Sequence, residues 1–531
     1  MLARSLVLLT AVVASVCAVT SPAFADPSPT RADDWRVTRT RHFEIFSSTT
    51  EEETRELAVE LERFHALILV SLGGVQGELA LPTRVFAFDR RSDYDRFAPN
   101  RTDGVFRAGT RTNDIVLFAT SRGRWAREAA FHEYVHCVLR SVSSVRYPLW
   151  YEEGFADLLS TARVHKGAMA IGAVPKRRVD SLRLGRWMST TRLVSGRSYG
   201  DFVGRHRAML YAQGWALVHY LSLDRERSGS VVQELSRHLA LLAVGASPEA
   251  AFHEAFGESA DSAGRNLRKR LVAGGFRAVA VPLAELDTGL EEPVVAGLPL
   301  VETSIRLGEL ALNGGDAQRA EVEFRAALGL DPARARAEAG LGTALRRQDR
   351  WAEAAPHFER AIEIDPGDPL NHLDLGNHLF LLAMQEGRVA GLSAILERAR
   401  TAYARSLELD PARIETQAML GAIHLAPGGD PANAVRPLER ALERLPSSLP
   451  IRNLLVEAYV ANGREREARA TLEAAIADSG DDAAGSSIED PLASIRARRS
   501  EVEARGDRLA EDGRLPGTEA SGSSDSDRGG S

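Results

Sequence analysis

The sequence predicts an α+β domain, built from a small sheet and helices, followed by an all-α repeat solenoid. In the first half, strand-like segments precede helical ones, as in α+β domains. One of those helical segments carries two histidines and a glutamate within five residues. The second half repeats with a period of about 34 residues, which is typical of stacked helical hairpins. With 531 residues, the chain is too long for a single hydrophobic core, so at least two domains are expected.

The N-terminus has the pattern of a secretory signal peptide. A basic start is followed by an apolar run at residues 6–19, and then by the small-x-small site that ends at Ala25. We therefore expect cleavage after Ala25 and export to the periplasm or beyond the cell. Val16 is larger than the residue expected before an acylated cysteine, which argues against lipid anchoring at Cys17. Cys137 then remains the single cysteine, so no internal disulfide is expected.

Charge and hydrophobicity argue against a nucleic-acid partner and against a membrane span. Charged residues make up 26% of the chain and the formal net charge is −7, so nucleic acid is not an expected partner. After the N-terminal segment, no apolar run reaches the length of about 18 residues that a membrane span needs. We expect an exported protein without a membrane span.

The first half is predicted to alternate short strands with helices before becoming mainly helical up to residue 277. Apolar and polar residues alternate around Phe43 and Ile45, which predicts a strand. A helix is expected at 51–72 and a second strand at 83–89. Residues 104–120 read as two strands around a polar turn at 112–114, and the strand at 111–120 is a candidate edge strand for an extended peptide.

The second half contains about five copies of one pattern. The recurring positions are Leu307, Ala320, Phe324, Ala327 and Pro332 in the first copy, and Leu341, Ala354, Phe358, Ala361 and Pro366 in the second. The third copy carries an insertion near 385–393. This pattern resembles the tetratricopeptide repeat, in which small residues let two helices approach and a proline ends the second helix. The resemblance implies a solenoid with a concave face for a protein partner.

The stretch FHEYVHCVLR, at residues 131–140, has the features of a metal site. On a helix, His132 and His136 lie on one face, one turn apart, so both side chains can reach one ion. Glu133 is turned by about 100° around the helix axis, which places it beside the ion. Cys137 is turned away from His136, so we interpret it as a small buried apolar side chain.

A third metal ligand is expected from the following helix, in the stretch PLWYEEGFADLL. Asp157 lies one turn after Glu153 on the same face, where it can fix the tautomer of a ligand histidine. Glu152 is the rival ligand, but its neighbour one turn on is Ala156, which cannot do so. The face argument therefore favours Glu153.

The motif H-E-x-x-H with a later E-G-x-A-D resembles the gluzincin metallopeptidases, and the context W-Y-E-E-G-F-A is similar to peptidase MA-like domains. The resemblance implies a zinc ion held by His132, His136 and Glu153, with Glu133 as the general base. It implies hydrolysis of peptide bonds by Glu-assisted attack of a zinc-bound water. Tyr211 is a candidate donor to the developing oxyanion.

Two functions are compatible with these features. The first is an exported zinc peptidase whose repeats recruit a protein substrate or partner. The alternative is a non-catalytic scaffold of the cell envelope with an inactive or structural metal domain. The expected organisation is a signal peptide (1–25), a linker (26–34), a gluzincin-like domain (35–280), a linker (281–297), a tetratricopeptide-repeat domain (298–480) and a disordered tail (481–531).

Overall fold

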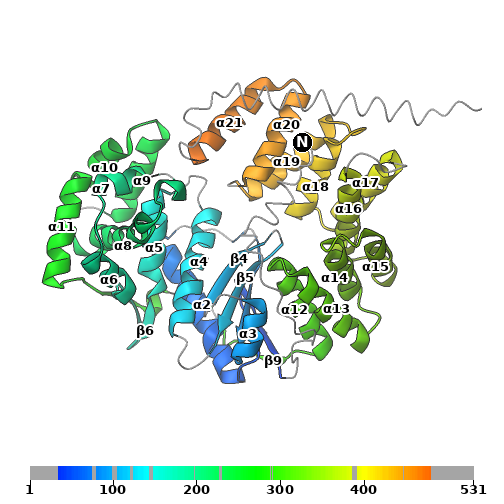
Figure 1. Ribbon diagram of the computed structural model, residues 1–531, viewed down its shortest axis with the longest axis horizontal. Coiled ribbons are helices and arrows are strands. Elements are labelled where there is room, and N and C mark those ends of the chain that lie inside the picture. Colours follow the sequence, from blue (N-terminus) through cyan, green and yellow to red (C-terminus); the bar gives the residue numbers. More distant parts are fainter. Residues whose placement is uncertain are drawn as a thin grey trace, which may run out of the picture.

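The computed structural model describes residues 34–479, except 75–78, 80, 99–103, 110, 120–123, 143–146, 197, 226–229, 287–288, 290, 386–391 and 447. The predicted signal peptide, Cys17 and the predicted tail lie outside the described residues. Most of the insertion in the third repeat also lies outside them. Within the described part, the chain is mostly helical, with a small N-terminal sheet region and a C-terminal helical solenoid (Figure 1).

The N-terminal sheet has six strands in the order β4-β5-β3-β2-β1-β9. Their bounds are β1 (Arg36–Arg39), β2 (Phe43–Ser47), β3 (Thr83–Phe88), β4 (Gly104–Ala108), β5 (Asn113–Phe118) and β9 (Ala296–Gly297). The three central strands β2, β3 and β5 are parallel, whereas β4, β1 and β9 pair antiparallel with their neighbours. Strand β9 lies in the predicted linker at 281–297, so that connector completes the sheet.

Strand β5 is not at the edge of the sheet, so the prediction of an edge strand at 111–120 is wrong. It lies between β4 and β3, and β4 forms the edge. The predicted turn at 112–114 is also displaced, because Asn113 and Asp114 are strand residues and both are buried. Asp114 forms a bidentate ion pair with Arg84 of β3, at 2.8 and 3.0 Å. A buried partner for the carboxylate is thus the reason that a turn-like sequence forms a strand.

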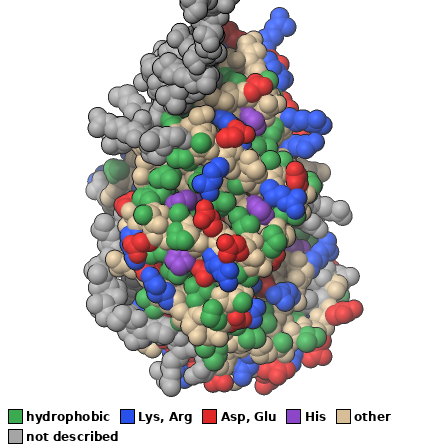
Figure 2. Space-filling view, turned by 90° about the vertical axis from the view of Figure 1, so that its right-hand side faces the viewer, with side chains coloured by type: hydrophobic (Ala, Val, Ile, Leu, Met, Phe, Trp, Pro, Cys, Tyr) green, Lys and Arg blue, Asp and Glu red, His purple; other side chains and the backbone are tan. Residues whose placement is uncertain are grey.

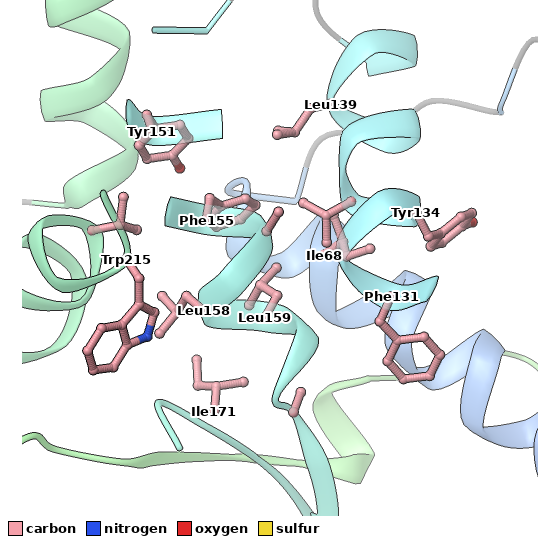
Figure 3. Packing of buried hydrophobic residues seen from close by; sticks show 14 of the residues in the cluster. Ile68, Phe131, Tyr134, Leu139, Tyr151, Phe155, Leu158, Leu159, Ile171 and Trp215 are labelled. Carbon is pink, nitrogen blue, oxygen red and sulfur yellow. The ribbon is translucent and has the colours of Figure 1, made fainter. Parts of the chain in front are cut away.

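One face of the sheet is covered by helices α2 (Glu51–Ser71) and α4 (Arg124–Val142), α5 (Leu149–Ser160) packs against α4, and α8 (Arg205–His219) packs against α5. Helix α2 begins with a capping box between Thr50 and Glu53. The rings of Phe64 in α2 and Phe131 in α4 stack with centroids 4.1 Å apart. Figure 3 shows Leu158 and Leu159 of α5 in this core, with Trp215 of α8 on one side. Helix α5 is therefore buried along its length between two helices.

The segment after α5 is mainly helical up to residue 277, as predicted, but two short strands interrupt it. It contains a second, three-stranded sheet made of β6 (Arg163–His165), β7 (Ala168–Ile171) and β8 (Val279–Pro282). Residues Lys166 and Gly167, both with positive φ, make the tight turn between β6 and β7. The other elements around this core are α3 (Arg91–Phe97), α6 (Lys176–Leu184), α7 (Thr190–Ser195), η1 (Tyr199–Asp201), η2 (Tyr220–Asp224), α9 (Val231–Ala243), α10 (Pro248–Phe256), α11 (Ala260–Ala273) and η3 (Leu283–Glu285).

The solenoid consists of five helix pairs in the described residues, as the repeat pattern predicts. They are α12 (Leu300–Asn313) with α13 (Ala317–Leu330), α14 (Ala335–Arg346) with α15 (Trp351–Ile364), α16 (Pro369–Met384) with α17 (Leu392–Leu409), α18 (Ile414–His424) with α19 (Ala432–Arg444), and α20 (Leu449–Ala461) with α21 (Glu465–Ser479). Small residues permit the close contacts between them. A Cβ on Gly340 of α14 would lie 2.3 Å from the ring of Phe324 in α13.

The second face of the sheet packs against the start of the solenoid. Phe46 and Phe86 of the sheet share one apolar cluster with Ile305 and Leu341 of the first two repeats. In Figure 1 the repeats run from α12 beside the sheet to α20 and α21 at the far end of the array. Figure 2 shows a face on which basic and acidic side chains are interspersed. Among the helices that the structure describes, none has the length and apolar character needed to span a bilayer.

Candidate metal centre

Helices α4 and α5 bring three potential metal ligands together. His132 Nε2 lies 3.1 Å from Glu153 Oε2 and 3.2 Å from His136 Nε2. His136 Nε2 lies 3.6 Å from the same carboxylate oxygen. These three residues form the group of His, Cys, Asp and Glu side chains in the described part of the chain that can hold a metal ion. The side chains of Glu153 and His136 are buried, at 2% and 7% exposed.

Two glycines allow the backbones of α5 and α8 to cross at close range. A Cβ on Gly154 would lie 2.3 Å from the carbonyl oxygen of Gly214, and a Cβ on Gly214 would lie 2.9 Å from that of Trp150. The backbones of the two helices therefore touch at this crossing. Because Gly154 follows Glu153 directly, this contact also fixes the position of the third potential ligand relative to α8.

The spacing of the three atoms fits a tetrahedral zinc site. Bonds of about 2.0–2.1 Å to a tetrahedral zinc ion place its ligand atoms about 3.3 Å apart. The observed separations of 3.1, 3.2 and 3.6 Å surround that value. In addition, two imidazole nitrogens face each other, an arrangement that requires a proton or a cation between them. Two histidines and a carboxylate are a donor set that zinc accepts in catalytic sites.

A carboxylate lies beside the Nδ1 atom of each histidine. His132 Nδ1 lies 3.0 Å from Asp157 Oδ1, and His136 Nδ1 lies 3.3 Å from Glu152 Oε1. Arg178 of α6 donates two hydrogen bonds to Asp157, at 2.6 and 3.0 Å. The contact with Asp157 directs His132 Nε2 toward Glu153, which is how ligand histidines are oriented in metal sites, and Glu152 lies within ion-pair distance of His136.

The electrostatics of the group favour positive charge at its centre. Burial acts to lower the pKa of His132, but Asp157 and Glu153 outweigh it and raise the pKa to about 10. Burial has the same effect on His136, and Glu152 and Glu153 raise its pKa. For Glu153, burial acts to raise the pKa, yet hydrogen bonds from His132 and His136 lower it. The pocket thus stabilises an ionised carboxylate beside positive charge.

Glu133 is exposed, on the side of α4 that faces solvent, next to the paired histidines. Tyr211 lies near it: its ring centroid is 6.4 Å from that of His132, and the Arg178 guanidinium lies 4.7 Å above its ring. Burial, followed by the charge of Glu153, raises the pKa of Tyr211 to about 12, so its hydroxyl stays protonated. The group therefore has an accessible carboxylate and a hydroxyl donor at its rim.

Sequence reasoning missed three residues of this site. Tyr199, in the short helix η1, donates a hydrogen bond to Glu153 Oε1. Arg178 anchors Asp157, and Glu152, considered only as a rival ligand, approaches the second histidine instead. Tyr199 lies 46 residues after Glu153 in the sequence, and Arg178 lies 21 residues after Asp157. Neither residue therefore belongs to a local motif. Cys137 is half-buried and contributes to the apolar packing around α4.

Comparison with known proteins gives matches in the repeats. Residues 305–369 and 428–489 match the tetratricopeptide repeat family. Among curated proteins there is no significant match. One similar solved structure is a thermophilic TPR protein of Thermus thermophilus, with 20% identity, 38% of this chain and 98% of that chain covered, and a TM-score of 0.30. Another is PilF of Pseudomonas aeruginosa, with 18% identity, 40% and 97% covered, and a TM-score of 0.30. The chain therefore contains tetratricopeptide repeats, an architecture for protein–protein interaction, next to a small N-terminal sheet region.

Proposed function

We propose that the chain is an exported zinc-dependent peptidase of the gluzincin type, whose repeats bring a protein substrate or partner to the metal centre. One observation supports this proposal most strongly: His132, His136 and Glu153 converge with separations of 3.1 to 3.6 Å, while Glu133 stands exposed beside them. A scaffold has no need for an accessible carboxylate at this position, whereas a hydrolase does.

In this proposal the two histidines and Glu153 hold the ion, and Asp157 and Glu152 keep the imidazoles oriented. When bound, zinc supplies Lewis acidity that makes a water molecule nucleophilic near neutral pH. Glu133 takes the proton from the water as its oxygen attacks the peptide carbonyl. Glu133 then passes that proton to the leaving amine nitrogen as the C–N bond breaks. Tyr211 donates a hydrogen bond to the carbonyl oxygen as negative charge develops there.

The base is tested by the variant Glu133→Gln. We expect this variant to retain zinc and its thermal unfolding midpoint, and to lose at least about 100-fold in cleavage of an unstructured protein substrate. Glu254→Gln is a matched control, because Glu254 also follows a histidine on a helix but Gly257 stands where a second histidine would be. Undiminished cleavage by Glu133→Gln would show that the base is misassigned.

The second candidate function is a scaffold, which the comparisons favour because the family matches lie in the repeats. In that case the metal domain is structural and the repeats carry the biological role. The two candidates separate in cells that lack the native chain. Rescue by Glu133→Gln at the level of the wild type would favour the scaffold, and failure of that variant to rescue would favour the peptidase.

A further inference from the structure

The turn between β4 and β5 inserts one arginine between two repeats of the solenoid. Arg111 Nη2 donates to Asp374 Oδ1 of α16 at 2.6 Å, and its Nε donates to Glu415 Oε2 of α18 at 2.7 Å. Two longer hydrogen bonds, of 3.3 and 3.4 Å, reach the second oxygen of each carboxylate. The guanidinium of Arg111 is thus hydrogen-bonded to two carboxylates from consecutive repeats.

This pair of carboxylates has the geometry of a guanidinium receptor. The Asp374 side chain is 5% exposed and the Glu415 side chain is 17% exposed. Both carboxylates present two oxygens to the planar fork of Arg111, which is the pairing that guanidinium groups form best. Burial opposes the charge of Asp374, but Arg111 and Arg336 outweigh it and lower the pKa of that carboxyl. Asp374 therefore remains charged throughout the neutral range.

The receptor belongs to a charged track along the first helices of four successive repeats. Arg336 of α14 lies between Asp374 and Glu309 of α12, at 3.1 and 3.4 Å. Glu309, Arg336, Asp374 and Glu415 therefore follow the stack from α12 to α18, with Arg111 of the turn between the last two and Arg84 of β3 paired with Glu309. The sheet covers the α12 end of this row, so the part that suits a side chain of an extended polypeptide is the pair of carboxylates on α16 and α18.

Arg111 is partly exposed to solvent while it is bound to the two carboxylates. Its side chain remains 27% exposed while it makes all four hydrogen bonds. A guanidinium arriving from solvent would make the same bonds, so the exchange of one arginine for another leaves no carboxylate unpaired. The cost of displacing Arg111 then comes from the other contacts of the turn, which include the hydrogen bond from Asn313 Nδ2 to the Thr112 carbonyl oxygen at 3.4 Å.

We propose that Asp374 and Glu415 form a binding site for an arginine side chain of an extended segment of a partner protein, and that Arg111 is its internal occupant, displaced when the partner binds. This inference rests on the proposed recruiting role of the repeats and not on metal chemistry. Because the turn that carries Arg111 follows the edge strand β4, and β4 packs against α4, partner binding at the repeats also loosens the edge strand beside the helix that carries His132 and His136.

The test uses the full chain and the blocked pentapeptide Ala-Ala-Arg-Ala-Ala, measured by calorimetry. Removal of the internal occupant in Arg111→Ala should tighten peptide binding at least tenfold relative to the wild type. Addition of Asp374→Asn and Glu415→Gln to that variant should abolish binding. Peptides with lysine or citrulline in place of arginine should bind at least tenfold more weakly. Arg398→Ala, which removes an exposed solenoid arginine that pairs with Glu359, is the matched control and should leave affinity unchanged.

Amide hydrogen exchange of the wild-type chain gives a readout that does not depend on the variants. Saturation with the arginine peptide should speed exchange in residues 104–118 and not in α20. Equal binding by Arg111→Ala and wild type, equal binding of the lysine peptide, or unchanged exchange in 104–118 at saturation would each overturn the proposal. None of these results depends on zinc or on cleavage, so failure here is distinct from failure of the proposed peptidase activity.

Discussion

Asp157 determines the orientation of His132, and Arg178 in turn determines the position of Asp157. Through this chain of contacts, a residue on α6 acts on a potential ligand of α4 without touching the ion. Asp157→Asn keeps the size of the side chain but removes its charge. We expect it to weaken zinc affinity by about 10- to 100-fold, measured by competition with a chelator of known affinity. Asp180→Asn, an exposed change on α6, should leave affinity unaltered.

The same variant has a predicted signature in pH. The pKa of His132 rises to about 10 on folding, above its ordinary value of 6.5. The proton on His132 therefore stabilises the zinc-free chain fully below pH 6.5, and this stability is lost as pH rises toward 10. Zinc replaces that proton, so stabilisation by zinc should grow between pH 6.5 and pH 10. The gain should be smaller in Asp157→Asn, whereas an identical pH profile in both chains would contradict the role given to Asp157.

At the residue scale, the sequence predicts the candidate metal ligands that lie on one helix or on two helices adjacent in the chain. The i, i+4 pair and the carboxylate of the next helix are visible because local spacing determines which side chains share a face. Tyr199 and Arg178 were not predictable, since only tertiary packing of η1 and α6 brings them to α5. Glu152 was considered as a ligand, but whether it would face the ion or the back of His136 depends on the crossing of α4 and α5.

The crossing of α5 and α8 is where element packing controls the site. Gly154→Ala would place a methyl group 2.3 Å from a carbonyl oxygen, which neither backbone can accommodate without the helices separating. We expect a loss of at least about 2 kcal/mol in the free energy of unfolding, together with weaker zinc binding because Glu153 moves with α5. Urea denaturation and zinc titration measure the two effects.

Gly329 of α13 provides the control for that substitution. A Cβ there would meet no atom within 4 Å, so Gly329→Ala should be neutral or stabilising by up to about 1 kcal/mol. If Gly154→Ala were as stable as Gly329→Ala, the two helices would not be in backbone contact.

Strand β5 shows why element assignment from sequence was incomplete. Most of the predicted helices and strands of the sheet follow from periodicity: α2 buries one face in a single core, and alternate residues of β3 enter the two cores on either side of the sheet. Asn113 and Asp114 looked like a turn because their polar side chains usually seek water. The ion pair with Arg84, from a strand about 30 residues earlier, supplies the missing partner and keeps the strand intact.

For the molecule as a whole, the two halves share one apolar core. Phe46, Phe86 and Val116 of the sheet lie against the first two repeats. Deletion of residues 298–480 would therefore expose an aromatic face of the sheet. We expect the truncated chain to aggregate or to bind a hydrophobic dye strongly, as measured by light scattering and fluorescence. A truncated chain with the same unfolding midpoint as the intact protein would show that the halves are independent.

Zinc X-ray absorption on the purified intact chain tests the central claim most directly. The account predicts one zinc ion per chain after dialysis, with two imidazole nitrogens at about 2.0–2.1 Å and the remaining contacts from oxygen. The imidazole signal should weaken in His136→Ala while the oxygen shell remains. A chain that holds no zinc, or zinc without imidazole neighbours, would contradict a metal centre built from His132, His136 and Glu153.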